Sequence, residues 1–86
     1  MACYKIEWKS SATKDLRKLD QQVVPRIIAA VSALADQPIP LGCVKLKGSD
    51  YTYRIRVGDY RIIYEVFPSH LIVEIIRVRH RKDAYR

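Results

Sequence analysis

The sequence predicts an α+β fold in which an N-terminal strand and a two-helix hairpin precede a set of antiparallel strands. Residues 3–8 alternate apolar and polar side chains, residues 12–35 repeat apolar side chains at helical spacing, and two alternating runs within 53–64 are two residues apart. These periods of about 2 and 3.6 residues are those of strand and helix. A chain of 86 residues has room for one small domain, so residues 1–86 are expected to form a single domain.

The N-terminal half begins with a half-buried strand, in which Tyr4, Ile6 and Trp8 share one face. Ser10 or Ser11 is expected to cap a short amphipathic helix that follows. The apolar positions of that helix are Ala12, Leu16 and Leu19. Its polar side chains are predicted to face outward: Lys14, Asp15, Arg17 and Lys18.

A second helix is predicted after Asp20, which is expected to cap it, and it ends before Pro38. Its core-facing stripe comprises Val24, Ile27, Ile28, Val31, Leu34 and Ala35. Pro25 leaves two options, because proline within a helix removes a backbone hydrogen bond. Either the helix begins near Val24 with Pro25 in its first turn, or it begins at Gln21 and bends.

A β-hairpin is predicted where Gly58 and Asp59 separate two alternating runs. Glycine at the first central position favours a type II′ turn. This loop places Val57 opposite Tyr60 and Arg56 opposite Arg61. One face of the hairpin is apolar, with Tyr53, Ile55, Val57, Tyr60, Ile62, Tyr64 and Val66, and the other carries Arg54, Arg56 and Arg61.

The last strand is predicted within Leu71–Val78, a run rich in β-branched residues that follows a turn at 67–70. Its density of apolar side chains predicts the central position in the sheet. A basic tail occupies 79–86. The two helices are expected to cover one face of the sheet, which leaves the arginine face open.

Composition narrows the class of partner. The net charge of +7 and the pI of about 9.7 indicate a polyanion, an acidic partner protein, or both. No signal peptide or membrane span is evident, so a cytoplasmic protein without membrane contact is expected. Cys3 and Cys43 are expected to be reduced thiols, with a disulfide between them left open. No metal-binding spacing is present, and neither a metal nor a cofactor is expected.

The arginines of the hairpin have two interpretations: a solvated face, or a preformed site for an anion. If the long strand runs beside 60–67, its end brings His80, Arg81 and Tyr85 towards Arg54, Arg56 and Arg61. Such a group suits metal-free phosphoryl transfer in RNA, whose 2′-hydroxyl is the nucleophile. Alternatives remain for the others: His80 as a solvated residue, Tyr85 as a cover for the sheet edge, and Lys45 and Lys47 as surface charges or phosphate contacts.

The ordered motifs of the chain resemble the RelE/ParE superfamily of toxins from toxin–antitoxin pairs, especially its RelE branch, over essentially all 86 residues. The resemblance is carried by Tyr4-x-Ile6-x-Trp8, Ala12-x-x-x-Leu16-x-x-Leu19, Leu46-Lys47-Gly48, the run from Tyr53 to Tyr64, and Val78-x-His80-Arg81-Lys82-Asp83-x-Tyr85. It implies a RelE-like fold and a metal-independent endoribonuclease that cleaves messenger RNA in the ribosomal A site. The implied partners are a cognate antitoxin and the ribosome, with DNA contacted only through the antitoxin complex.

The resemblance also implies roles for individual residues. Arg54 and Arg56 would bind the RNA backbone and act at the scissile phosphate, and Arg61 would stabilise the transition state. Arg81 would protonate the leaving group or stabilise its charge, and Tyr85 would orient the bases. The implied product is a 2′,3′-cyclic phosphate. A ParE-like inhibitor of DNA gyrase without nuclease activity, or a binding module for RNA or antitoxin, shares the same fold.

Two departures from the family pattern matter. Some relatives have lysine where Arg54 and Arg56 stand, and arginine is a poor general base because it stays protonated. His80, which titrates near neutral pH, is therefore the hypothesised proton acceptor. Arg79 stands where many relatives have glycine, and it is expected either to add a phosphate contact or to alter the bend there.

Overall fold

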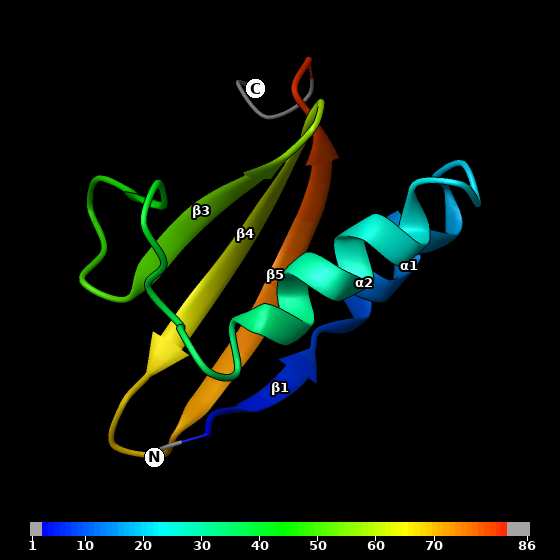
Figure 1. Cartoon of the computed structure of the whole chain (residues 1–86). Coiled ribbons are helices and arrows are strands. Elements are labelled where there is room, and N and C mark those ends of the chain that lie inside the picture. Colours follow the sequence, from blue (N-terminus) through cyan, green and yellow to red (C-terminus); the bar gives the residue numbers. More distant parts are fainter. Residues whose placement is uncertain (1–2, 83–86) are drawn as a thin grey trace.

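The computed structural model describes residues 3–82 and confirms the α+β class: two helices pack against a five-stranded sheet (Figure 1). The elements in chain order are β1 (Lys5–Trp8), α1 (Ser10–Arg17), α2 (Val24–Ala33), β2 (Val44–Lys45), β3 (Thr52–Val57), β4 (Tyr60–Phe67) and β5 (Ile72–His80). The strand order across the sheet is β1-β5-β4-β3-β2.

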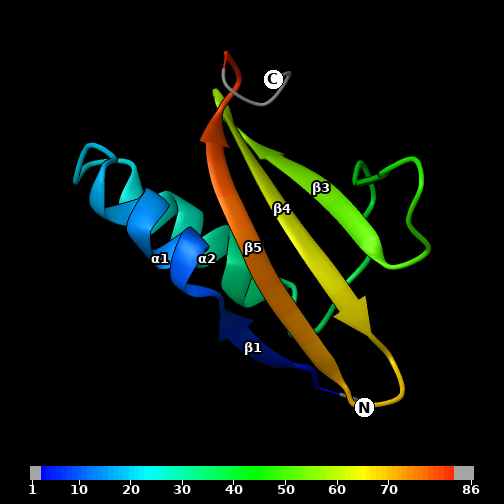
Figure 2. The ribbon, with the colours of Figure 1, turned by 180° about the vertical axis from the view of Figure 1, so that it is seen from behind.

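Both helices lie on one face of the sheet, and the opposite face is not covered by either helix. Seen from behind, β5 passes in front of α2 (Figure 2). We call the uncovered side the open face, and the end of the sheet at the β3–β4 turn the tip. The core fills the space between the two layers with Ala12, Ile27, Val31, Leu34, Ile62, Tyr64, Val66, Val73, Ile75 and Val78.

The N-terminal strand adds to the sheet in parallel with β5, from Lys5 beside Ile72 to Trp8 beside Ile75. The other three neighbouring pairs of strands are antiparallel. The middle strand is therefore β4, and the prediction that the last strand is central was wrong. The reason is that the two-residue strand β2 extends the far edge beyond β3, which the sequence pattern did not reveal.

The β3–β4 hairpin has the predicted register and turn. Val57 lies opposite Tyr60, and Arg56 lies opposite Arg61. Gly58 has a φ of 58°, and Leu71 is the single described non-glycine residue with positive φ. Asp59 therefore has negative φ, as a type II′ turn requires.

Both helix starts differ from the predicted caps. The residue before α1 is Lys9, which makes no side-chain capping bond, and Ser10 is the first helical residue. Before α2, the carboxylate of Asp20 accepts a hydrogen bond from the Gln22 N–H at 3.1 Å, so it closes the preceding turn instead of capping the helix. Pro25 lies in the first turn of α2, where its missing N–H costs nothing.

The apolar stripe of α2 is confirmed at Ile27, Val31 and Leu34, which are buried. Ile28, predicted to face the core, is 40% exposed. The stripe on this short helix is narrower than the sequence period suggested, because the sheet contacts the helix along one line of residues.

Asp15 is the main correction to the predicted surface, because it is only 8% exposed. β1 stops beside Ile75, so the next residues of β5 have no neighbouring strand on that side. Two side chains of α1 supply the hydrogen bonds that a neighbouring strand would otherwise make with the backbone of β5. The Ser11 hydroxyl donates to the Ile76 carbonyl at 2.7 Å, and Asp15 Oδ2 accepts from the Val78 N–H at 2.9 Å. Asp15 also binds the Arg77 guanidinium, with Nε–Oδ2 at 3.0 Å.

Tyr64 makes the stability of the fold sensitive to alkaline pH. Its ring is fully buried, and its hydroxyl donates to the Pro38 carbonyl at 2.8 Å. Burial, and then the neighbouring Cys43 thiol, raise the pKa of Tyr64 above its ordinary value. The neutral phenol is thus favoured in the folded state, and its contribution to stability is complete below about pH 10, where an unfolded tyrosine ionises.

We expect this contribution to fall as pH rises, by about 1 kcal/mol between pH 10 and pH 11. Tyr64→Phe should remove that slope and, at pH 7, cost about 1 kcal/mol for the lost hydrogen bond. Urea unfolding of both proteins at pH 7, 10 and 11 measures the difference. Parallel pH curves for the two proteins would contradict the assignment.

Candidate active site

Three arginines form one row across neighbouring strands on the open face. Arg56 on β3 is the register partner of Arg61 on β4, and Arg61 is the register partner of Arg79 on β5. Their chain neighbours Ile55, Ile62 and Val78 pack in or against the core, so the arginines point the other way. We call Arg56, Arg61 and Arg79 the arginine row.

Arg61, at the centre of the row, is buried, and no carboxylate of the described residues forms an ion pair with it. It is 8% exposed, and its Nη1 has no hydrogen-bond partner among the described residues. A buried cation that lacks an acceptor is costly, because desolvation is not compensated. Its flanking register partners are both cationic. This arrangement is unfavourable in the free protein and becomes favourable when an anion supplies acceptor oxygens.

Arg56 and Arg54 complete the cationic end of the open face. Arg56 is exposed, and its Nε donates to the Gly58 carbonyl at 3.0 Å, which holds its side chain against the turn. Arg54 lies in the next row, where its register partner on β4 is Ile63. The register predicted from the two-residue turn therefore placed Arg54, Arg56 and Arg61 on the correct face of the sheet.

The predicted lysines lie apart from the arginine row. Lys45 is the register partner of Tyr53, which packs against the core, so it belongs to the opposite side of the sheet. Its ammonium is 3.9 Å from the carboxylate of Asp50. Lys47 is exposed in the loop after β2. These positions give neither lysine a contact with an anion at Arg61.

His80 was predicted to join the arginines, and that placement is wrong. It pairs with Tyr60, and the two rings meet edge to face with centroids 5.3 Å apart on the helix side of the sheet. The cause is an irregularity in the β4–β5 pairing: Ile63 faces Arg77 and Tyr64 faces Ile75, so Ile76 is an extra residue. One extra residue reverses the facing of every later side chain. It is what brings Arg79 to the open face.

The start of the basic tail is tied to the hairpin turn, as predicted. The Arg81 N–H donates to the Asp59 carbonyl at 2.7 Å, and the Arg81 side chain is exposed. Arg81 is therefore adjacent to the tip of the sheet. Tyr85, which was predicted to contribute to the same site, lies outside the described residues.

Comparison with known proteins identifies the family. The model of the ParE toxin of type II toxin–antitoxin systems (parDE) matches residues 6–85. Toxin RelG of Mycobacterium tuberculosis is 35% identical, over 96% of this chain and 97% of its own. The chain belongs to the RelE/ParE superfamily of type II toxins. The resemblance of its motifs to that superfamily, and to its RelE branch, is thereby confirmed.

Solved structures agree with this RelE-type assignment. The RelBE2 toxin–antitoxin complex of Mycobacterium tuberculosis matches with a TM-score of 0.81 at 30% identity, over 96% of this chain and 97% of that one. The archaeal RelE–RelB complex of Pyrococcus horikoshii matches with a TM-score of 0.82 at 28% identity, over 98% and 100%. The toxin therefore shares its fold with these RelE-type proteins over the 96% and 98% of the chain that the two comparisons cover.

The toxin also carries an acidic row that sequence reasoning missed. Glu74 on β5 is the register partner of both Glu7 on β1 and Glu65 on β4. These three glutamates, which we call the acidic row, lie on the open face about 13 Å along β4 from Arg61, at roughly 3.3 Å per residue. Finding them required the parallel pairing of β1. The open face thus carries cations near the tip and three carboxylates at the other end, where the Lys5 ammonium is 3.8 Å from the Glu7 carboxylate.

The described residues are also informative about metal-binding groups, disulfides and membrane-spanning helices. Within residues 3–82, no three His, Cys, Asp or Glu side chains are grouped so as to hold a metal ion, the acidic row included. Cys3 and Cys43 are free thiols. None of the helices in this part of the chain combines the length and apolar character that crossing a bilayer requires.

Proposed function

We propose that this toxin is a metal-independent endoribonuclease that cleaves messenger RNA in the ribosomal A site, and that a cognate antitoxin inhibits it. The observation that carries the proposal is Arg61, a buried guanidinium whose Nη1 has no acceptor within residues 3–82, held between Arg56 and Arg79. A phosphodiester placed there supplies the missing acceptor oxygens. Fixed guanidinium groups match two phosphate oxygens at once, which lysine does not do.

The reaction needs few protein groups, because RNA provides its own nucleophile. The 2′-hydroxyl loses its proton as its oxygen attacks the adjacent phosphorus, and a 2′,3′-cyclic phosphate forms. The bond to the 5′-oxygen of the next nucleotide breaks, and that oxygen takes up a proton, so the protonation of the RNA is balanced overall. Negative charge on the equatorial oxygens is stabilised by cations that are already in place. Arg61 is assigned this role, with Arg54 and Arg56 binding the backbone. Arg81 is assigned to the leaving oxygen and Tyr85 to base orientation.

A ParE-like inhibitor of DNA gyrase is the second candidate, because the family model that matches residues 6–85 is described as a ParE toxin. Such an inhibitor acts by binding a protein and has no need of a buried, unpaired arginine. The arginine row therefore favours the nuclease. An antitoxin partner is supported by the RelE relatives that were solved as complexes with RelB.

Mapping of RNA ends after expression of the toxin separates the two candidates. We expect primer extension to reveal new 5′ ends within translated codons, absent from the same message after its start codon is removed. Co-expression of the neighbouring antitoxin frame should abolish the cuts. Intact messages together with trapped gyrase–DNA complexes would contradict the nuclease and support the ParE-like function.

A further inference from the structure

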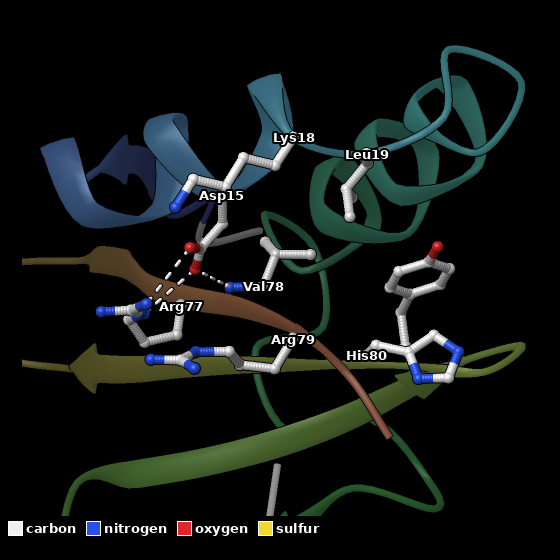
Figure 3. A pocket seen from close by; sticks show the side chains of 8 residues that line it. Asp15, Lys18, Leu19, Arg77, Val78, Arg79 and His80 are labelled. Carbon is white, nitrogen blue, oxygen red and sulfur yellow. Dashed lines mark hydrogen bonds and ion pairs between the residues drawn. The ribbon is translucent and has the colours of Figure 1, made fainter. Parts of the chain in front are cut away.

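A second concave site lies at the tip, on the helix side of the sheet. Two adjoining hollows of about 340 and 280 Å³ share Tyr60 and His80 in their walls. Lys18 and Leu19 line the first hollow beneath the connection between the helices (Figure 3). Arg26 lines the second hollow. We call the two hollows together the tip cleft. Each is near the lower end of the volumes that hold small ligands, which run from about 300 Å³ upward.

The walls of the tip cleft combine aromatic rings with cations. The His80 and Tyr60 rings meet edge to face, and His80 Nδ1 accepts a hydrogen bond from the Lys82 N–H at 3.3 Å. In the neutral ring the proton then resides on Nε2, which becomes a donor. Rings of this kind stack on nucleobases of any sequence.

The charges around the cleft favour an anion. Lys18 and Arg26 are exposed cations on its walls. The carboxylate of Asp15 is neutralised by Arg77 at 3.0 Å, which leaves Asp59 as the other acidic lining residue. A base on the rings with its phosphate on a lysine or arginine fits this distribution.

Arg79 connects the cleft to the arginine row. It is the register partner of Arg61 on the open face, and it also lines the first hollow of the cleft. It can do both because β5 is an edge strand beyond Ile75, where β1 ends. Figure 3 shows Arg77 held by Asp15 while Arg79 extends beside it along the strand, free of any drawn bond. Arg79 therefore borders both the arginine row and the tip cleft.

We propose that the tip cleft is a second nucleotide subsite, which stacks one base of single-stranded RNA on His80 and Tyr60 and binds its phosphate through Lys18 or Arg26. This inference rests on the proposed binding of RNA by the arginine row. The base held in the cleft belongs to a nucleotide next to the one whose phosphate lies at Arg61. His80 is thereby a binding residue for the base.

A double-mutant cycle between protein and RNA tests the subsite. Short RNAs made with 2′-O-methyl nucleotides, which cannot be cleaved, are prepared with one abasic position at each site in turn. For the full-length protein, one abasic position should weaken binding about 5- to 100-fold, as expected for loss of a stacked base. In His80→Ala the intact RNA should bind weaker by a similar factor, and that abasic position should have no further effect. His80→Phe, which retains a ring, should restore the abasic penalty.

Two other variants serve as controls. Arg17→Ala removes an exposed cation of α1 outside the cleft and should change neither affinity nor penalty. Arg61→Ala should weaken every RNA and leave the abasic penalty intact, because it acts at the row. The subsite is overturned if the abasic position weakens binding equally in the parent protein and in His80→Ala. It is also overturned if the parent protein does not bind RNA. If the His80 substitution and the abasic position are coupled but no messenger is cleaved in cells, the subsite is supported and the proposed nuclease activity is contradicted.

Discussion

Arg61→Leu is expected to lower messenger cleavage about 100- to 1,000-fold, the loss that follows removal of one preorganised charge-stabilising donor. The same change should not weaken the fold. The buried Nη1 of Arg61 has no acceptor in the part of the chain that the structure describes, and relieving a buried unsatisfied polar group contributes about 1–3 kcal/mol. The free energy of unfolding is thus expected to stay level or rise while activity falls. End mapping of a single message and urea unfolding measure the two quantities.

Two further variants make this result specific. Arg61→Lys keeps the positive charge without the planar fork and should recover only part of the activity. Arg17→Ala removes the same charge from an exposed site on α1 and should leave cleavage unchanged. A large loss of stability in Arg61→Leu with full activity in the remaining folded protein would show that the arginine is structural.

Asp15→Ala is expected to cost about 2–3 kcal/mol of folding free energy, because it removes a buried carboxylate that accepts hydrogen bonds from Val78 and from Arg77, whose side chain is 36% exposed. The change leaves the Arg77 guanidinium without its carboxylate partner and the buried Val78 N–H without its acceptor. Asp15→Asn keeps an acceptor oxygen without the charge and should cost less. Denaturant unfolding of the three proteins measures the series.

A matched carboxylate serves as the control for Asp15. Asp20 accepts one hydrogen bond in an exposed turn, so Asp20→Ala should cost at most about 1 kcal/mol. Removing both partners in Asp15→Ala/Arg77→Met should recover part of the loss, since no charge is then stranded. Equal losses for Asp15→Ala and Asp20→Ala would contradict the strand-like role of the α1 side chains.

Features set by neighbouring residues were predictable from the sequence. The Gly58 turn fixed the register of β3 and β4, and with it the facing of Arg56 and Arg61. Pro25 similarly limited where α2 could begin. Such features follow from local backbone geometry, which a short stretch of sequence determines.

Features that depend on distant pairing were not predictable. Asp15 is buried because the edge of β5 needs partners where β1 ends, and the two are far apart in sequence. The extra residue Ile76 has no signature in a run of β-branched side chains, yet it sends Arg79 to the open face and His80 to the helix side. A single irregularity thus placed Arg79 in the arginine row and moved His80 away from it.

The acidic row has a consequence for the direction in which a polyanion lies on the sheet. Charge repulsion is screened within about 8 Å at physiological salt, so only phosphates directly above Glu7, Glu65 and Glu74 are strongly disfavoured. A nucleic acid laid lengthwise along β4 would place phosphates there, whereas one laid perpendicular to the strands would not. A polyanion bound at the arginine row is therefore expected to cross the sheet transversely at the tip, with its two ends leaving over opposite edges.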